Sequence, residues 1–156
     1  MKNYEINEGT KAIISLGENK SKVLEDNYEY IINNSSYEII NHSCKYFGSS
    51  LEGRRESTKS LLGFSYKVPI IVDEYRNLIF FPTNDYNSDN CIWLSISKIK
   101  DLEYYKYNST KVIFKDGKSI IIPISHYSIQ NQIYRATRLD LIMRDRKKEN
   151  NNFNHF

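Results

Sequence analysis

The chain has 156 residues and a mass of 18.5 kDa, enough for one domain with a sizeable core but too short for two. Its longest apolar runs span four or five residues, as at Leu78–Phe81, which excludes a membrane-spanning helix of about 20 residues. The net charge of +3 is uneven, because residues 1–41 have four basic against seven acidic side chains and residues 42–156 have 18 against 12. With two cysteines and no apolar secretory stretch at the N-terminus, we expect a cytosolic protein with reduced thiols and no membrane partner.

The first part of the chain predicts short strands. Lys11–Leu16 and Tyr28–Ile32 have the composition of strands, and the polar stretch 17–27 connects them. Tyr37–Phe47 alternates imperfectly and favours a third strand.

A helix is predicted next. Ser49 and Glu52 have the spacing of a capping box, in which each side chain accepts a hydrogen bond from the other's backbone N–H. The helix extends to about Leu62, and Gly63 supplies a left-handed C-terminal stop. Its basic side chains lie off the apolar face, so we expect them to be displayed to solvent.

Hairpins dominate the middle of the chain. Pro69–Pro82 predicts one hairpin, and a polar loop at Asn84–Asn90 separates it from Cys91–Ile99, a strand with one buried face. Lys111–Ser125 predicts a second hairpin, because Asp116-Gly117 readily adopts the positive φ angles of a two-residue turn.

A second helix follows Ser125, where the apolar period becomes helical. Its stripe consists of Ile129, Ile133, Ala136, Leu139 and Met143. Residues 147–156 have no periodicity and predict a disordered tail after a single domain at 1–146. The expected fold class is α+β, a mainly antiparallel sheet of hairpins with two helices and no helix-turn-helix, since neither helix has a second one a short turn away.

No motif points to catalysis or to a cofactor. Cys44 and Cys91 with His42 and His126 lack the Cys-x-x-Cys pair of a strong zinc motif, so buried thiols are favoured over a metal. Gly48–Gly53 opens a helix as a phosphate-binding loop does, but without Gly-Lys-Ser/Thr it is no P-loop, and helix capping explains it. The 13 tyrosines favour sheet packing over a stacking platform for single strands.

Basic residues concentrate in two segments, 42–67 and 135–148. Such clusters are typical of a surface that binds a polyanion, most often nucleic acid, and charge alone leaves solvated helix faces as an equal alternative.

Within the first segment, Ser43–Ser50 followed by Gly53-Arg54-Arg55 resembles the ComK family of competence transcription factors of low-GC Gram-positive bacteria. The similarity continues in the same order at the following motifs: Pro69–Asp73, Phe81-Pro82-Thr83, Cys91-x-Trp93, Pro123-Ile124-Ser125 and Asn131–Arg135.

The resemblance implies a non-enzymatic, DNA-binding activator of competence genes. Family members bind paired A/T-rich boxes, largely through the minor groove, as assemblies of dimers, so the implied partners are A/T-rich double-stranded DNA and a second copy in a homodimer or tetramer. An activator of this kind would also contact RNA polymerase. Longer members continue beyond the equivalent of Arg146 with a segment linked to activation and to the adaptor for a Clp protease, and the resemblance does not extend to those two properties.

The predicted DNA contacts come from both basic segments. Arg54 and Arg55 rank first because they lie in the family-like stretch. The full set is Lys45, Arg54, Arg55, Lys59, Lys67, Arg135 and Arg138. An alternative function is a shortened, non-catalytic module that pairs with a full-length competence activator and modulates it.

Overall fold

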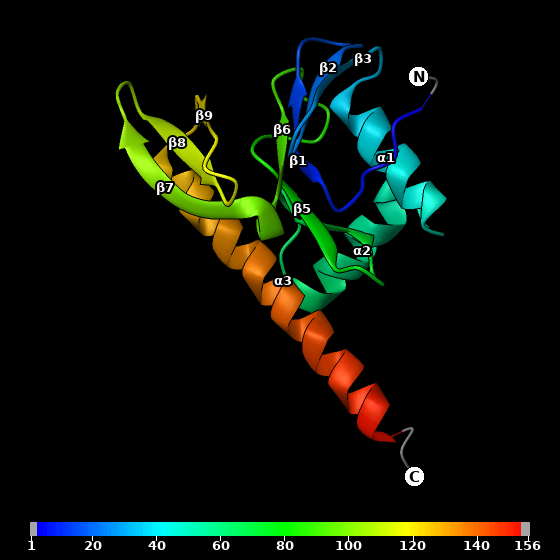
Figure 1. Cartoon of the computed structure of the whole chain (residues 1–156). Coiled ribbons are helices and arrows are strands. Elements are labelled where there is room, and N and C mark those ends of the chain that lie inside the picture. The colour runs from blue at the N-terminus through cyan, green and yellow to red at the C-terminus, as the bar shows by residue number, and fades with distance from the viewer. Residues whose placement is uncertain (1–2, 154–156) are drawn as a thin grey trace.

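Two antiparallel sheets and three α-helices make up the part of the chain that the structure describes, so the expected α+β class is confirmed. The structure is a computed structural model and describes residues 3–153. The larger sheet has the strand order β3-β2-β1-β6-β5-β4 and the smaller sheet the order β7-β8-β9 (Figure 1). The strands are β1 (Thr10–Ser15), β2 (Ser21–Glu25), β3 (Glu29–Ile32), β4 (Ile70–Asp73), β5 (Leu78–Pro82), β6 (Ile92–Ser95), β7 (Ile99–Tyr105), β8 (Ser109–Phe114) and β9 (Ser119–Ile122). The helices are α1 (Ser36–Tyr46), α2 (Leu51–Leu62) and α3 (His126–Phe153), with a short 3-10 helix η1 (Ile96–Lys98).

The large sheet is covered on both faces. Its strands alternate, so Phe80 and Trp93 pack with α1 and the start of α2 in one core cluster. Phe81 and Leu94 point the other way, into a second cluster shared with the small sheet and α3. The order of layers is therefore α1 and α2, the large sheet, and then the small sheet with α3 (Figure 1).

The predicted strand at Tyr37–Phe47 is wrong, because these residues form most of α1. Its buried positions are Ser36, Ile39, Ile40, Ser43 and Cys44, which have the i, i+3, i+4, i+7, i+8 spacing of one helix face. The polar connector expected at 17–27 also contains a strand, β2, whose Val23 and Leu24 are buried on opposite faces of the sheet.

Helix α2 is confirmed with a different N-cap. The N-cap is Ser50 rather than Ser49, and its hydroxyl accepts a hydrogen bond from the backbone N–H of Gly53 at 3.0 Å. Glu52 is therefore the second residue of the helix and not the third, where a capping box requires its acidic residue. Gly63 is left-handed, with φ of 77°, as expected. Since only residues 47–50 separate α1 from α2, the reason given for excluding a helix-turn-helix does not hold.

The hairpins are confirmed with two local differences. Strand β6 is buried on both faces and ends in η1 at Ile96, where a continuous strand to Ile99 was expected. In the β8–β9 hairpin the N–H of Phe114 donates to the carbonyl of Lys118, so the loop has three residues, and only Gly117 has a positive φ, of 87°.

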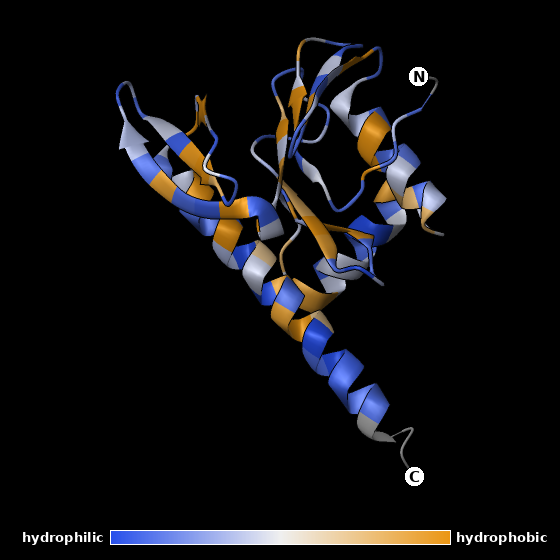
Figure 2. Cartoon of the chain, viewed as in Figure 1, coloured by the Kyte–Doolittle hydropathy of each residue, from blue (hydrophilic) through white to orange (hydrophobic). Residues whose placement is uncertain are grey.

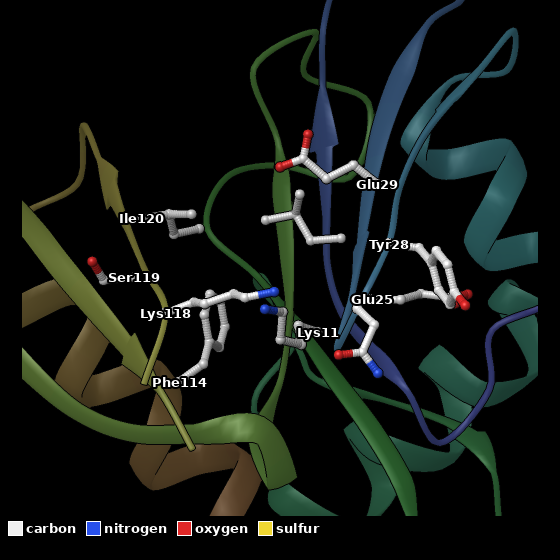
Figure 3. Close-up of a pocket in the computed structure, with 10 residues that line it drawn as sticks. Lys11, Glu25, Tyr28, Glu29, Phe114, Lys118, Ser119 and Ile120 are labelled. Atoms are coloured by element: carbon white, nitrogen blue, oxygen red, sulfur yellow. The ribbon is translucent and has the colours of Figure 1, made fainter. Parts of the chain in front are cut away.

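Three lysines join the two sheets. Lys11 of β1 is buried and its Nζ lies 2.8 Å from Asp116 of the β8–β9 turn. Lys98 Nζ lies 2.8 Å from Asp26 Oδ2, and Lys118 Nζ donates to the Asp26 carbonyl at 3.0 Å. A pocket of about 160 Å³ opens at this seam, where Lys11 and Lys118 direct their ammonium groups into the gap (Figure 3).

Helix α3 begins after Ser125, whose hydroxyl accepts a hydrogen bond from the N–H of Ser128. The predicted apolar stripe faces the second core cluster. The helix continues to Phe153, so residues 147–153, predicted as disordered tail, are helical, and 154–156 lie outside the described residues. Its far half is hydrophilic and extends beyond the sheets (Figure 2). Within residues 3–153, no helix combines the length and apolar character needed to cross a bilayer.

Candidate nucleic-acid interface

The structure brings the two basic segments together at one surface loop. Residues 64–67, called here the 64–67 loop, lie between α2 and β4, an edge strand of the large sheet, and α3 lies against them. Arg135 Nη1 donates to the carbonyl of Tyr66 at 3.1 Å, and its guanidinium lies 4.0 Å from the centroid of the Phe64 ring. A residue of the second basic segment therefore contacts the end of the first.

The buried side chain of Gln132 fixes this contact. Gln132 is 2% exposed, and its Nε2 donates to the carbonyl of Lys67 at 2.9 Å and to the carbonyl of Pro82 at 2.7 Å. Lys67 has a φ of 51°, a left-handed conformation that costs a non-glycine residue about 1 kcal/mol. The two bonds from one amide tie α3, the loop and β5 together, and they hold Lys67 in this conformation.

Arg55 completes a group of three cations around the loop. Its guanidinium lies 5.5 Å from the centroid of the Tyr86 ring, and it lines a pocket of about 140 Å³ together with Tyr66 and Lys67. Burial raises the pKa of the Tyr86 phenol, which remains neutral and donates to the carbonyl of Val68. We call Arg55, Lys67 and Arg135 the loop cations.

Carboxylates offset part of this charge. Glu52 and Asp85 line the same pocket, and Glu52 Oε2 lies 3.5 Å from Arg55 Nη1. An exposed ion pair of this kind contributes about 0.2–1 kcal/mol. Glu52 therefore reduces the positive charge around Arg55 but holds its guanidinium only weakly. No carboxylate within residues 3–153 forms an ion pair with Lys67 or Arg135, which makes these two the most available charges at the loop.

The other predicted contacts lie elsewhere or are paired. Arg54 points about 100° around α2 from Arg55. Its side chain is only 16% exposed, and its Nη1 lies 3.7 Å from Glu74. Lys59 Nζ lies 3.3 Å from Glu56. Lys45 at the end of α1 and Arg138 on α3 are exposed. The geometry thus separates Arg54 and Arg55 and does not support ranking Arg54 first.

Sequence reasoning missed two residues that shape the site. Gln132 gives no charge signal, although a buried amide on a helix otherwise faced by apolar residues implies a specific partner. Tyr66 is 62% exposed and contacts two loop cations, because Lys67 Nζ lies 5.4 Å from its ring centroid and Arg135 donates to its carbonyl. The sequence signal that could have identified Tyr66 is its position in a short aromatic and basic run, Phe64 to Lys67, directly after the helix-stop residue Gly63.

The cysteines do not form a reactive centre. Both are buried free thiols, as expected. Burial raises the pKa of Cys44 to about 12 and that of Cys91 to about 11, so both stay protonated at neutral pH and are poor nucleophiles. Within the described residues, no three His, Cys, Asp or Glu side chains gather as a metal site would require.

Taken together, the fold and the site define an α+β protein in which cations from separate elements gather around one surface loop. A family model described as "ComK protein" matches residues 1–148, and the chain belongs to this family, which confirms the resemblance. The chain is 33% identical over 149 residues to the "Competence transcription factor" of Bacillus subtilis (strain 168), an alignment that covers 94% of this chain and 78% of the relative. No solved structure matches the chain.

Proposed function

We propose that the protein is a transcriptional regulator of genetic competence that binds A/T-rich promoter boxes largely through the minor groove. The name of the Bacillus subtilis relative, a competence transcription factor, supports the regulatory role. The observation that carries the DNA-binding part is the convergence of Arg55, Lys67 and Arg135 from α2, the 64–67 loop and α3. Cations fixed on a rigid framework lose little conformational entropy when they meet a polyanion.

The charges of α2 favour the minor groove over the major groove. A recognition helix inserts its solvent face into the major groove, but the solvent face of α2 carries Glu52 and Glu56, which phosphates would repel. A cationic loop fits the alternative, because A-tracts have a narrow minor groove whose enhanced negative potential attracts Arg and Lys. We therefore place the 64–67 loop, rather than α2, at the groove.

Binding is tested by fluorescence anisotropy with an A/T-box duplex and a scrambled G/C-rich duplex, each over a range of salt concentrations. The wild type is expected to prefer the A/T box and to lose affinity steeply with salt as counterions are displaced. Lys67→Asn removes a charge while keeping a residue that tolerates the left-handed conformation. It should lower the slope of log affinity against log salt by about 1.

Lys106→Asn is the matched control, since Lys106 is an exposed lysine on the β7–β8 turn, away from the 64–67 loop. It should bind as the wild type does. The proposal fails if the wild type shows no preference for the A/T box, or if Lys67→Asn and Lys106→Asn have the same affinity and salt slope.

The arginine pair on α2 offers a second test. Arg55→Ala should weaken binding several-fold, whereas Arg54→Ala should weaken it less, because Arg54 is largely buried beside Glu74. Thermal unfolding of both variants provides the control for folding. Equal losses for the two variants, with both proteins folded, would contradict the placement of the loop at the groove.

We also propose that the protein binds DNA as a homodimer or a tetramer, as the resemblance to its family implies. Light scattering should give a mass of two or four chains for the free protein and of four chains on a duplex with two boxes. A single chain per box at saturation would rule this out.

A further inference from the structure

We infer that Tyr66 is an aromatic wedge that inserts against a base step of the bound DNA from the minor-groove side. This inference rests on the proposed function and adds to it the residue that contacts bases rather than phosphates. Tyr66 is 62% exposed on the 64–67 loop, and two successive carbonyls, its own and that of Lys67, accept hydrogen bonds from α3.

The rigidity of the loop is the first step of the argument. The carbonyl of Tyr66 accepts from Arg135 Nη1 at 3.1 Å, and the carbonyl of Lys67 accepts from the buried amide of Gln132 at 2.9 Å. Arg135 is itself held by stacking on Phe64 at 4.0 Å and by a hydrogen bond to Gln132 Oε1 at 3.3 Å. An exposed side chain on a fixed backbone is unusual, because most surface loops are mobile.

The chemistry around the ring is the second step. Arg55 and Lys67 line the same pocket as Tyr66, Lys67 Nζ lies 5.4 Å from the centroid of its ring, and Arg135 donates to its carbonyl. Minor-groove proteins combine cations with a side chain that inserts between base steps, partly unstacking them. The minor groove presents only a degenerate pattern of hydrogen-bond donors and acceptors. An aromatic ring can stack on any base, so it adds affinity without reading that pattern.

The wedge implies a preference among A/T sequences. Unstacking costs a few kcal/mol per step and is easiest at pyrimidine–purine steps such as TA. A box that contains one TA step at the insertion point should therefore bind more tightly than an uninterrupted A-tract of the same length. Cations alone would favour the A-tract, whose minor groove is narrower.

The experiment uses the full chain and permanganate, which oxidises thymines that have lost stacking. Wild type at saturation should make one thymine step per box hyperreactive. Tyr66→Phe should keep both affinity and pattern, whereas Tyr66→Ala should weaken binding about tenfold to a hundredfold and, at saturation, lose the hyperreactive step. Tyr66→Ser repeats the test with a second small residue, and thermal unfolding confirms that each variant folds.

Tyr107→Ala is the matched control, because Tyr107 is 90% exposed on the β7–β8 turn with Lys106 Nζ at 5.8 Å from its ring. It should behave as the wild type. The inference is overturned if Tyr66→Ala binds with wild-type affinity, if wild type produces no hyperreactive thymine, or if Tyr66→Phe loses as much as Tyr66→Ala, since the hydroxyl would then carry the contact. In each of these cases the proposed function stands, whereas failure of the wild type to bind the A/T box at all removes both.

Discussion

The amide of Gln132 is the single group on which the geometry of the site most depends. We predict that Gln132→Ala destabilises the protein and loosens the 64–67 loop. The substitution leaves the carbonyls of Lys67 and Pro82 without this donor, and the bond to Pro82 is buried. A buried polar group that loses its partner costs about 1–3 kcal/mol, and the more exposed Lys67 carbonyl adds less because water replaces the amide.

The expected total is a loss of about 2–3 kcal/mol in the free energy of unfolding, measured by urea denaturation. For a chain of this length that corresponds to a fall of roughly 4–12 °C in Tm. DNA affinity should fall as well, even though Gln132 carries no charge, because Lys67 and Tyr66 lose their fixed positions.

Gln130→Ala is the matched control for this prediction. Gln130 is an exposed glutamine half a turn away on the same helix, so its loss should change the free energy of unfolding by less than about 0.5 kcal/mol. Finding the two alanine variants equally stable would refute the argument that Gln132 clamps the loop.

Three further predictions concern the backbone and the seam between the sheets. Gly117→Ala should cost about 1 kcal/mol in urea denaturation, because Gly117 has φ of 87° with open space around an added Cβ; a cost near zero would show that the turn rearranges. Lys67→Gly should unfold at or slightly above the wild-type urea concentration while binding DNA more weakly, and a clear loss of stability would contradict left-handed strain at this residue. Burial alone would raise the pKa of Asp116, but the hydrogen bond from Lys11, the N–H of Lys118 and both ammonium charges lower it below its ordinary value of 3.8. Asp116→Asn should therefore be less stable than wild type by about 1–2 kcal/mol at pH 7, with the difference shrinking as pH falls below about 4 and the carboxylate protonates; a difference that stays constant down to pH 2.5 would exclude this linkage.

The sequence predicted the parts of the fold whose pattern is local. The β8–β9 hairpin was predicted from two short apolar runs on either side of Asp116-Gly117, and the α3 stripe repeats with a helical period, so neither depends on distant residues. Helix α1 was misassigned because Ile39-Ile40 and the aromatic residues around it favour strands by composition. The available signal was Ser35, whose hydroxyl accepts from the N–H of Glu38 at 3.1 Å, a start of the same type as the one recognised for α2.

The candidate site was predicted in its residues more than in its arrangement. Charge clustering identified Arg55, Lys67 and Arg135, but no local pattern shows that Gln132 meets a carbonyl 65 positions earlier in the chain. The separation of Arg54 from Arg55 was available from helix geometry, since consecutive residues of an α-helix point about 100° apart. Which of the two faces Glu74 and which faces the loop depended on how α2 packs on the sheet.

The site lies where the layers of the protein meet, and this explains why it can be both charged and rigid. Strand β4 is the edge of the large sheet, and the 64–67 loop precedes it after α2 has crossed from the first core cluster, at Leu51, to the second, at Leu62. Helix α3 belongs to the layer on the opposite face, and the side chains of Gln132 and Arg135 on this helix hold the loop by hydrogen bonds to its carbonyls. Arg55 is paired with Glu52, but Arg135 is held by the carbonyl of Tyr66, the amide oxygen of Gln132 and the Phe64 ring, which do not cancel its charge. A surface built in this way keeps its positive charge available for a polyanion while retaining the fixed geometry that shape-selective binding requires.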